Sequence, residues 1–231
     1  MRKKKHGAER IAACGEFLIP NPPEKAISEY FGTSRPLHLE IGAGKGRFAC
    51  EMARRNPDAC YFAMERVTDC VVLAAERAAS GEYGELSNLR FVIDTADNLL
   101  HMLGRGTVDT ILLNFSDPWS KKGYAKRRLT HRRYLAMYMN LLRDGGVLRF
   151  KTDNVGLFDF SLEEIGAMGL ECRIVTRDLH ASEWNEGNVM TEYEENFSSQ
   201  GYTINMLELV KPAGFNPEVA SEFLTKESYL R

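Results

Sequence analysis

Short apolar runs alternate along this chain with stretches of helical periodicity. Five of the runs have the length of buried strands, and they are Leu37–Ile41, Cys60–Met64, Leu89–Ile93, Val108–Asn114 and Val147–Lys151. Apolar residues spaced three and four apart predict helices between and after them, over Lys45–Arg55, Thr68–Ala79, Asn98–Leu103, Arg132–Leu142 and Val155–Met168. Strands that alternate with helices through short links form a doubly wound, mostly parallel sheet. We therefore expect an α/β fold.

The last two apolar runs predict the edge of this sheet. They are Leu170–Val175 and Tyr202–Val210, and no crossover pattern joins them. This favours an antiparallel edge strand and a total of seven strands. We expect three parts: a basic, proline-containing N-terminal arm over residues 1–36, one domain over 37–211, and a weakly patterned tail over 212–231.

Composition excludes several classes of protein. No apolar run approaches the roughly 20 residues of a membrane span, and no apolar stretch follows the basic residues 2–5 as it would in a signal peptide. The five cysteines are odd in number and form no CxxC pair, as expected for reduced thiols in a cytoplasmic protein. The five histidines show no ligand spacing, which predicts that no metal is bound. The net charge of −2 carries no signal for nucleic acid.

Acidic residues stand at the ends of four apolar runs: Glu40, Glu65, Asp117 and Asp153. The carboxyl ends of parallel strands line one edge of a sheet, where such folds bind ligands. Four carboxylates on that edge predict a site for a polar, hydroxyl-bearing and cationic ligand.

A glycine-rich turn follows Glu40, with glycines at 42, 44 and 46. The third glycine comes one residue earlier than in the dinucleotide fingerprint. Glu65 lies about 20 residues after the turn, where an acid binds ribose hydroxyls. A carboxylate at Glu40 repels phosphate and attracts an ammonium group. S-adenosylmethionine has a ribose and a charged amino acid but no phosphate, so it meets both demands. A turn without a ligand is the other interpretation of these glycines.

Four motifs carry a family resemblance. E-I-G-A-G-K-G at 40–46 resembles the S-adenosylmethionine motif of the seven-stranded methyltransferases. N-F-S-D-P-W-S-K-K at 114–122, with Thr152-Asp153 and T-E-Y-E-E-N-F at 191–197, resembles the signature of the bacterial tRNA (guanine-N7-)-methyltransferases. The resemblance covers residues 36–210. It implies a Rossmann-like class I fold, S-adenosylmethionine as cofactor, and methylation of N7 of guanosine 46 in the variable loop of tRNA by a monomer or homodimer.

The resemblance also implies roles for individual residues. The positions for cofactor contact are Glu40, Gly42, Gly44, Gly46, Glu65, Thr95, Ala96 and Asp117. Asp117 also matches the catalytic position. The positions for tRNA contact are Lys121, Asp153, Thr191, Glu192, Tyr193 and Glu194. The chain departs from the family at Thr95, where an acidic residue is usual, and at Ser116 and Ser120, where prolines are usual.

The chemistry of guanine N7 needs no general base, because this nitrogen has a free lone pair and no proton. We expect Asp117 to orient the base and to favour its developing positive charge. Seven basic residues lie between 120 and 133, and four of them are candidate phosphate contacts: Lys122, Lys126, Arg127 and Arg128. A solvated charge run is the alternative. Trp119 either stacks on the turned-out base or anchors its loop, and Thr191 to Glu194 also has the pattern of a helix capping box.

Three other functions remain open at this stage. Asp117-Pro118-Trp119 is similar to the motif of exocyclic-amine methyltransferases, although the second proline is missing. A non-catalytic module that binds RNA or the cofactor has the same fold. An NAD-dependent oxidoreductase is the third alternative.

Overall fold

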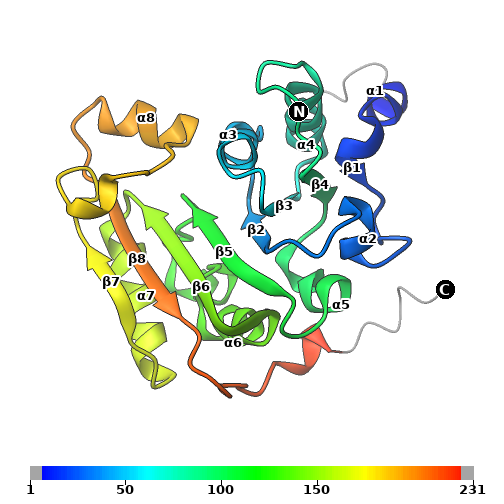
Figure 1. Ribbon diagram of the computed structural model, residues 1–231. Coiled ribbons are helices and arrows are strands. Elements are labelled where there is room, and N and C mark those ends of the chain that lie inside the picture. The colour runs from blue at the N-terminus through cyan, green and yellow to red at the C-terminus, as the bar shows by residue number, and fades with distance from the viewer. Residues whose placement is uncertain (1–6, 225–231) are drawn as a thin grey trace.

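The computed structural model describes residues 7–224 and shows one eight-stranded sheet with helices on both faces (Figure 1). The strand order is β1-β4-β3-β2-β5-β6-β8-β7. The strands are β1 (Leu18–Ile19), β2 (Leu37–Ile41), β3 (Cys60–Glu65), β4 (Leu89–Ile93), β5 (Val108–Asn114), β6 (Leu142–Thr152), β7 (Cys172–Thr176) and β8 (Asn205–Val210). All neighbouring pairs from β1 to β6 are parallel, so their carboxyl ends meet at one edge.

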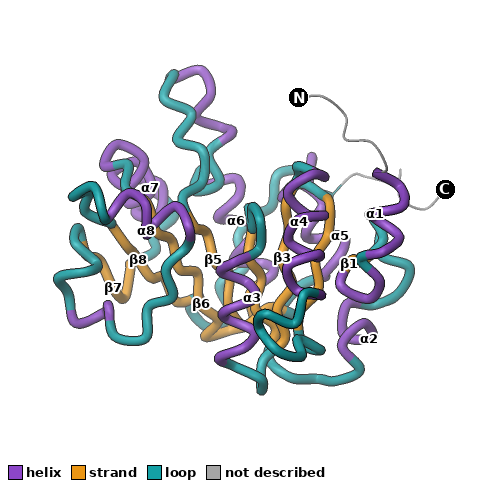
Figure 2. Tube along the Cα trace, turned by 90° about the horizontal axis from the view of Figure 1, so that it is seen from above, coloured by secondary structure: helices purple, strands orange, loops and turns teal. Residues whose placement is uncertain are grey.

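The helices form two layers. They are α1 (Gly7–Ala13), α2 (Ile27–Phe31), α3 (Arg47–Arg55), α4 (Thr68–Ala79), α5 (Leu99–Leu103), α6 (Arg132–Leu141), α7 (Val155–Ala167) and α8 (Glu192–Ser198). α3 and α4 pack on one face of β3 and β4, whereas α5, α6 and α7 pack on the other face of the sheet (Figure 2). α8 lies apart from both layers, above the edge at which β5 and β6 end (Figure 1).

Strand β3 shows how the sequence creates the two cores. Tyr61 and Ala63 pack with α3 and α4, while Phe62 and Met64 pack into the cluster that contains α5, α6 and α7. Successive side chains of a strand point to opposite faces, so a strand covered on both sides is apolar throughout. This explains the unbroken apolar runs of the sequence.

The predicted α/β fold, with a mostly parallel sheet and an antiparallel edge, is confirmed. β8 is antiparallel to both β6 and β7. The sheet has eight strands instead of seven, because the N-terminal arm adds β1, whose Leu18 and Ile19 pair with Phe91 and Val92. Two residues are too few to show a strand period. β6 begins at Leu142, five residues before the predicted strand Val147–Lys151, and it runs across an irregularity in its pairing with β5.

The predicted division into arm, domain and tail stays a prediction. The basic residues 2–5 and the last seven residues lie outside the described part of the chain. Within residues 7–224, no helix combines the length and apolar character that a membrane crossing requires.

Candidate active site

A cavity of about 710 Å³ opens at the carboxyl ends of β2, β3, β4 and β5. This volume lies within the usual range for small-ligand sites. Its wall includes residues that the sequence analysis singled out: Gly42, Glu65, Thr95, Ala96, Asp117, Trp119, Lys126 and Arg127. The cavity wall does not include Glu40, Gly44, Gly46 or the predicted tRNA contacts. The topology thus gathers residues from four strand ends around one space.

The glycine turn has the backbone that only glycine adopts easily. Gly42, Gly44 and Gly46 have φ angles of 87°, 54° and 77°. A Cβ on Gly46 would lie 2.6 Å from the Cβ of Ala74, so this glycine lets α3 pack closely on α4. A Cβ on Gly44 would meet nothing within 4 Å, so this residue leaves open space for a ligand.

Glu65 is held in place by the backbone at the end of β3. Its Oε2 accepts a hydrogen bond from the N–H of Gly44 at 3.1 Å, and its Oε1 accepts one from Val67 at 2.9 Å. Each carboxylate oxygen has a second lone pair. The half-buried side chain can therefore still accept hydrogen bonds from two neighbouring hydroxyls of a sugar.

Glu40 is buried beneath the turn, at the end of β2. Its Oε1 accepts a hydrogen bond from Asn114 at 3.0 Å, whereas its Oε2 is buried and has no partner among the described residues. Burial raises the pKa of this carboxyl to about 7, against the smaller effects of Asn114 and of the Lys151 charge. An unpaired buried acceptor fits a cationic donor such as an ammonium group.

Asp94 is a site residue that the sequence analysis missed. It directly follows β4 and lines the cavity. Its Oδ1 accepts from the Thr95 N–H at 2.7 Å and from Asn98 at 2.6 Å, while its buried Oδ2 has no partner within residues 7–224. Asp94 could have been found from its position at the end of a strand, which it shares with Glu65 and Asp117. The comparison with the family motif instead placed Thr95 at the position where an acidic residue is usual.

Asp117 lies in a loop with unusual backbone angles. Phe115 and Trp119 on either side have φ angles of 52° and 41°, in the left-handed region that non-glycine residues rarely adopt. Such angles persist where the surrounding structure imposes them, often at functional sites. The exposed carboxylate of Asp117 lies 3.3 Å from the guanidinium of Arg66.

The basic block beyond Asp117 divides into two groups. Lys121, Lys122, Lys126 and Arg127 are exposed, and the Arg127 guanidinium also lies 5.0 Å from the ring centre of Trp119. Arg128 is partly buried and donates hydrogen bonds to the carbonyls of Pro118 at 2.9 Å and Trp119 at 3.2 Å. The structure thus gives Arg128 an internal role that the sequence did not reveal.

The predicted tRNA contacts on and next to α8 also have different surroundings from one another. Thr191 caps the helix, since its Oγ1 accepts from the N–H of Glu194 at 2.9 Å. The Tyr193 hydroxyl lies 3.4 Å from Asp153, and Glu192 forms an ion pair with Arg77 at 2.8 Å. Glu194 is fully buried, and its carboxylate contacts Lys151 in place of completing the capping box.

Comparison with solved structures identifies the fold. An antibiotic-related methyltransferase aligns with a TM-score of 0.60 at 18% identity, over 80% of this chain and 91% of its own. The 16S rRNA methyltransferase KamB aligns with a TM-score of 0.61 at 13% identity, over 84% and 97%. A variant of the 16S rRNA (adenine(1408)-N(1))-methyltransferase from Catenulisporales acidiphilia, solved with S-adenosylmethionine, gives 0.57 at 14%, over 84% and 95%. The chain therefore has the fold of the class I methyltransferases.

The family follows from the sequence itself. The model of a family described as "Putative methyltransferase" matches residues 34–207, which is more than half of the chain. The chain therefore belongs to this S-adenosylmethionine-dependent family, that of the tRNA (guanine-N7-)-methyltransferases.

Proposed function

We propose that this protein transfers a methyl group from S-adenosylmethionine to N7 of guanosine 46 in the variable loop of tRNA. The observation that carries the proposal is the cavity beside the glycine turn, where Glu65, Asp94 and Asp117 lie at the ends of three strands. Family membership supports the activity, and the neighbouring basic block supports an RNA substrate.

The residues present fit the cofactor. Glu65 accepts hydrogen bonds from the ribose hydroxyls, since the turn holds its carboxylate at the cavity. Glu40 pairs with the ammonium group of the methionine half through its unpaired oxygen. Asp94 accepts from the amino group of the adenine through its own unpaired oxygen, with Thr95 and Ala96 beside it. When bound, S-adenosylmethionine supplies an electrophilic methyl group.

Asp117 is the residue that we place at the reacting base. Its exposed carboxylate can accept hydrogen bonds from the N1–H and the 2-amino group of guanine, which adenine cannot supply in this pattern. The methylated base becomes cationic, and a nearby carboxylate favours that charge as it develops. Because N7 carries no proton, Asp117 orients and stabilises without removing one.

The basic block and Trp119 bind the RNA in this proposal. Lys121, Lys122, Lys126 and Arg127 are exposed beside the cavity and are placed to bind phosphates. The guanosine must leave its stacked position to reach the cavity. The half-buried ring of Trp119 lines the cavity, where it can stack on the extruded base.

We also propose that the protein acts in the cytoplasm. All five cysteines are unpaired thiols, as in a reducing compartment. Residues 37–211 would form the methyltransferase domain, with the arm and the tail as additions to it.

The test is a methyl-transfer assay with purified protein and labelled S-adenosylmethionine. The matched substrates are one tRNA transcript with guanosine at position 46 and the same transcript with adenosine there. We expect transfer to the first only, with mass spectrometry of nuclease digests locating the methyl group at N7. A methyl group on an exocyclic amine would contradict the proposed specificity, and no transfer to either RNA would indicate a non-catalytic module.

A further inference from the structure

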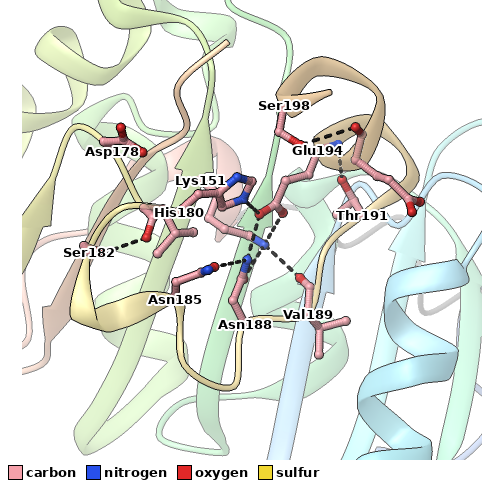
Figure 3. Close-up of polar contacts among 12 residues, drawn as sticks. Lys151, Asp178, His180, Ser182, Asn185, Asn188, Val189, Thr191, Glu194 and Ser198 are labelled. Atoms are coloured by element: carbon pink, nitrogen blue, oxygen red, sulfur yellow. Dashed lines mark hydrogen bonds and ion pairs between the residues drawn. The ribbon is translucent and has the colours of Figure 1, made fainter. Parts of the chain in front are cut away.

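A buried lysine of β6 and a buried glutamate of α8 meet in the structure (Figure 3), and neither of them lines the cavity. Lys151 lies near the end of β6, and its Nζ is 2.5 Å from Oε2 of Glu194. The same ammonium group donates to the carbonyl of Val189 at 3.0 Å and to Oδ1 of Asn188 at 3.1 Å. An ammonium group has three donors, so Lys151 has none left for an RNA phosphate.

Both oxygens of the Glu194 carboxylate also have partners within the protein. Its Oε1 accepts from Asn188 Nδ2 at 2.8 Å and lies 2.9 Å from Nε2 of His180. Burial opposes the ionisation of Glu194, but the Lys151 charge and the hydrogen bonds outweigh it and lower the pKa of the carboxyl. Figure 3 shows that these side chains converge from separate segments, with His180 on one side and Asn188 on the other.

Two residues nearer the surface, Tyr193 and Asp153, are close in the chain to Lys151 and Glu194. Tyr193, next to Glu194, has its hydroxyl 3.4 Å from Asp153, which is two residues beyond Lys151 on the chain. The ring of Tyr193 lies 4.9 Å from the ring of Phe115, which lines the cavity next to the Asp117 loop. The buried pair therefore lies directly under residues that face the expected RNA.

We propose that Lys151 and Glu194 are positioning residues, a buried clamp that holds the segment 188–194 so that Tyr193 and Asp153 are presented to the RNA substrate. The part of this inference that concerns RNA rests on the proposed function. It gives Glu194 an internal role in place of the direct tRNA contact that the family resemblance implies.

The test uses three variants of the full chain: Lys151→Met, Glu194→Gln and the double variant. Lys151→Met leaves a buried carboxylate without its cation, whereas the double variant leaves a neutral pair, which buried sites tolerate better. We expect amide hydrogen exchange across residues 188–195 to rise by about tenfold in Lys151→Met and to return toward the wild-type rate in the double variant. Glu194→Gln preserves the shape of the side chain and serves as the second single variant if Lys151→Met does not fold.

Enzyme kinetics distinguish a clamp from a direct contact. We expect kcat with tRNA to fall by about tenfold or more in Lys151→Met, because small displacements in a site cost that much, while the Kd for adenosylhomocysteine changes less than about threefold. The double variant should be more active than Lys151→Met. The matched control is Glu208→Gln, since Glu208 is another buried carboxylate of the sheet, held by Arg149 at 2.6 Å and away from the cavity wall. It should leave the tRNA constants unchanged.

Several results would overturn the clamp. Unchanged exchange across 188–195 in both single variants would show that the pair holds nothing in place. Additive losses of activity in the double variant, or a salt dependence of RNA binding that flattens by about one unit in Lys151→Met, would show direct RNA contact. If the wild-type protein fails to methylate tRNA, the proposed function fails, while the exchange measurement still decides whether the clamp exists.

Discussion

Glu40, at the end of β2, is the residue that we propose to bind the ammonium group of the cofactor, because its carboxylate is buried and one of its oxygens has no partner among the described residues. Its pKa of about 7 lies above the ordinary value of 4.5. Between these two pH values the folded chain holds a proton that the unfolded chain has released. Without a ligand, the Glu40 contribution to the free energy of unfolding therefore falls as the pH rises from 4.5 to about 7.

The affinity for the cofactor should change in the opposite direction and rise with pH. A cationic ammonium group binds the ionised carboxylate, so we expect the affinity for adenosylhomocysteine to rise as the pH passes from 5.5 to 8, by titration calorimetry. Glu40→Gln should bind more weakly at pH 8 and lose most of this pH dependence. An affinity that is independent of pH in the wild type would show that Glu40 does not face the ammonium group.

Asp117 gives a second prediction at the scale of one residue. Asp117→Asn should lower kcat by about 10²-fold, the usual order for one electrostatic group at a reacting centre. The melting temperature should change little, because the pair with Arg66 is exposed. At saturating S-adenosylmethionine, the kcat of the wild type should change little between pH 6 and 8.5. A steep loss of kcat that follows one carboxylate titration under these conditions would point to base catalysis.

At the scale of elements, the glycine turn contributes to packing and, as we propose, to cofactor binding. Gly46→Ala places a Cβ against Ala74 and Phe91 in the contact between α3 and α4, and it also requires a strained positive φ. We expect a loss of about 2–4 kcal/mol in the free energy of unfolding, measured with urea.

Gly44→Ala is the matched control for the packing effect. Its backbone strain is similar, but its Cβ would meet nothing within 4 Å. We expect a loss of only about 1–2 kcal/mol together with weaker binding of adenosylhomocysteine. Equal losses of stability in the two variants would show that the contact with α4 is not what requires Gly46.

Helix α8 is joined to α3 and α4 by ion pairs at the surface. Glu192 and Glu195 pair with Arg77 and Arg47 on the neighbouring helices, and Arg77 also donates to the carbonyl of Lys45 in the glycine turn. Exposed ion pairs of this kind contribute about 0–1 kcal/mol each. We therefore expect the buried Lys151 and the Thr191 cap to hold α8 in place more firmly than these surface ion pairs do.

At the scale of the whole molecule, charge is distributed unevenly although the net charge is only −2. The exposed lysines 121, 122 and 126 lie beside the cavity and have no hydrogen-bond partner for their ammonium groups among the described contacts. RNA affinity should therefore fall steeply with salt. We expect Lys122→Ala and Lys126→Ala each to flatten the log–log slope by about one unit, measured by filter binding.

Arg128→Ala tests whether Arg128 supports the Asp117 loop, unlike the exposed lysines that we expect to bind phosphates. Because Arg128 donates to the carbonyls of Pro118 and Trp119, its loss should reduce kcat through the Asp117 loop while the salt slope stays unchanged. A flattened slope in this variant would show that Arg128 binds phosphate as well.

Local sequence specified most of the fold. The segments β2, β4, β5 and α4 have the bounds that the apolar patterns predict, because each is a buried element with a clear period. The pattern missed β1, since the pairing of Leu18 and Ile19 with β4 depends on a distant strand. The candidate cofactor residues could be recognised in the sequence because they lie at the ends of the same apolar runs that predict the parallel strands.

The sequence by itself determined the alternation of strands and helices, the glycine turn and the acidic strand ends, because these depend on local periodicity and on backbone conformation. The tertiary structure alone decided which polar side chains are buried and which face outward. Thr191 and Tyr193 remain at the surface, while Glu194 is enclosed by Lys151, His180 and Asn188 from other segments. Burial is a property of what the rest of the chain places around a residue, and no short motif contains that information.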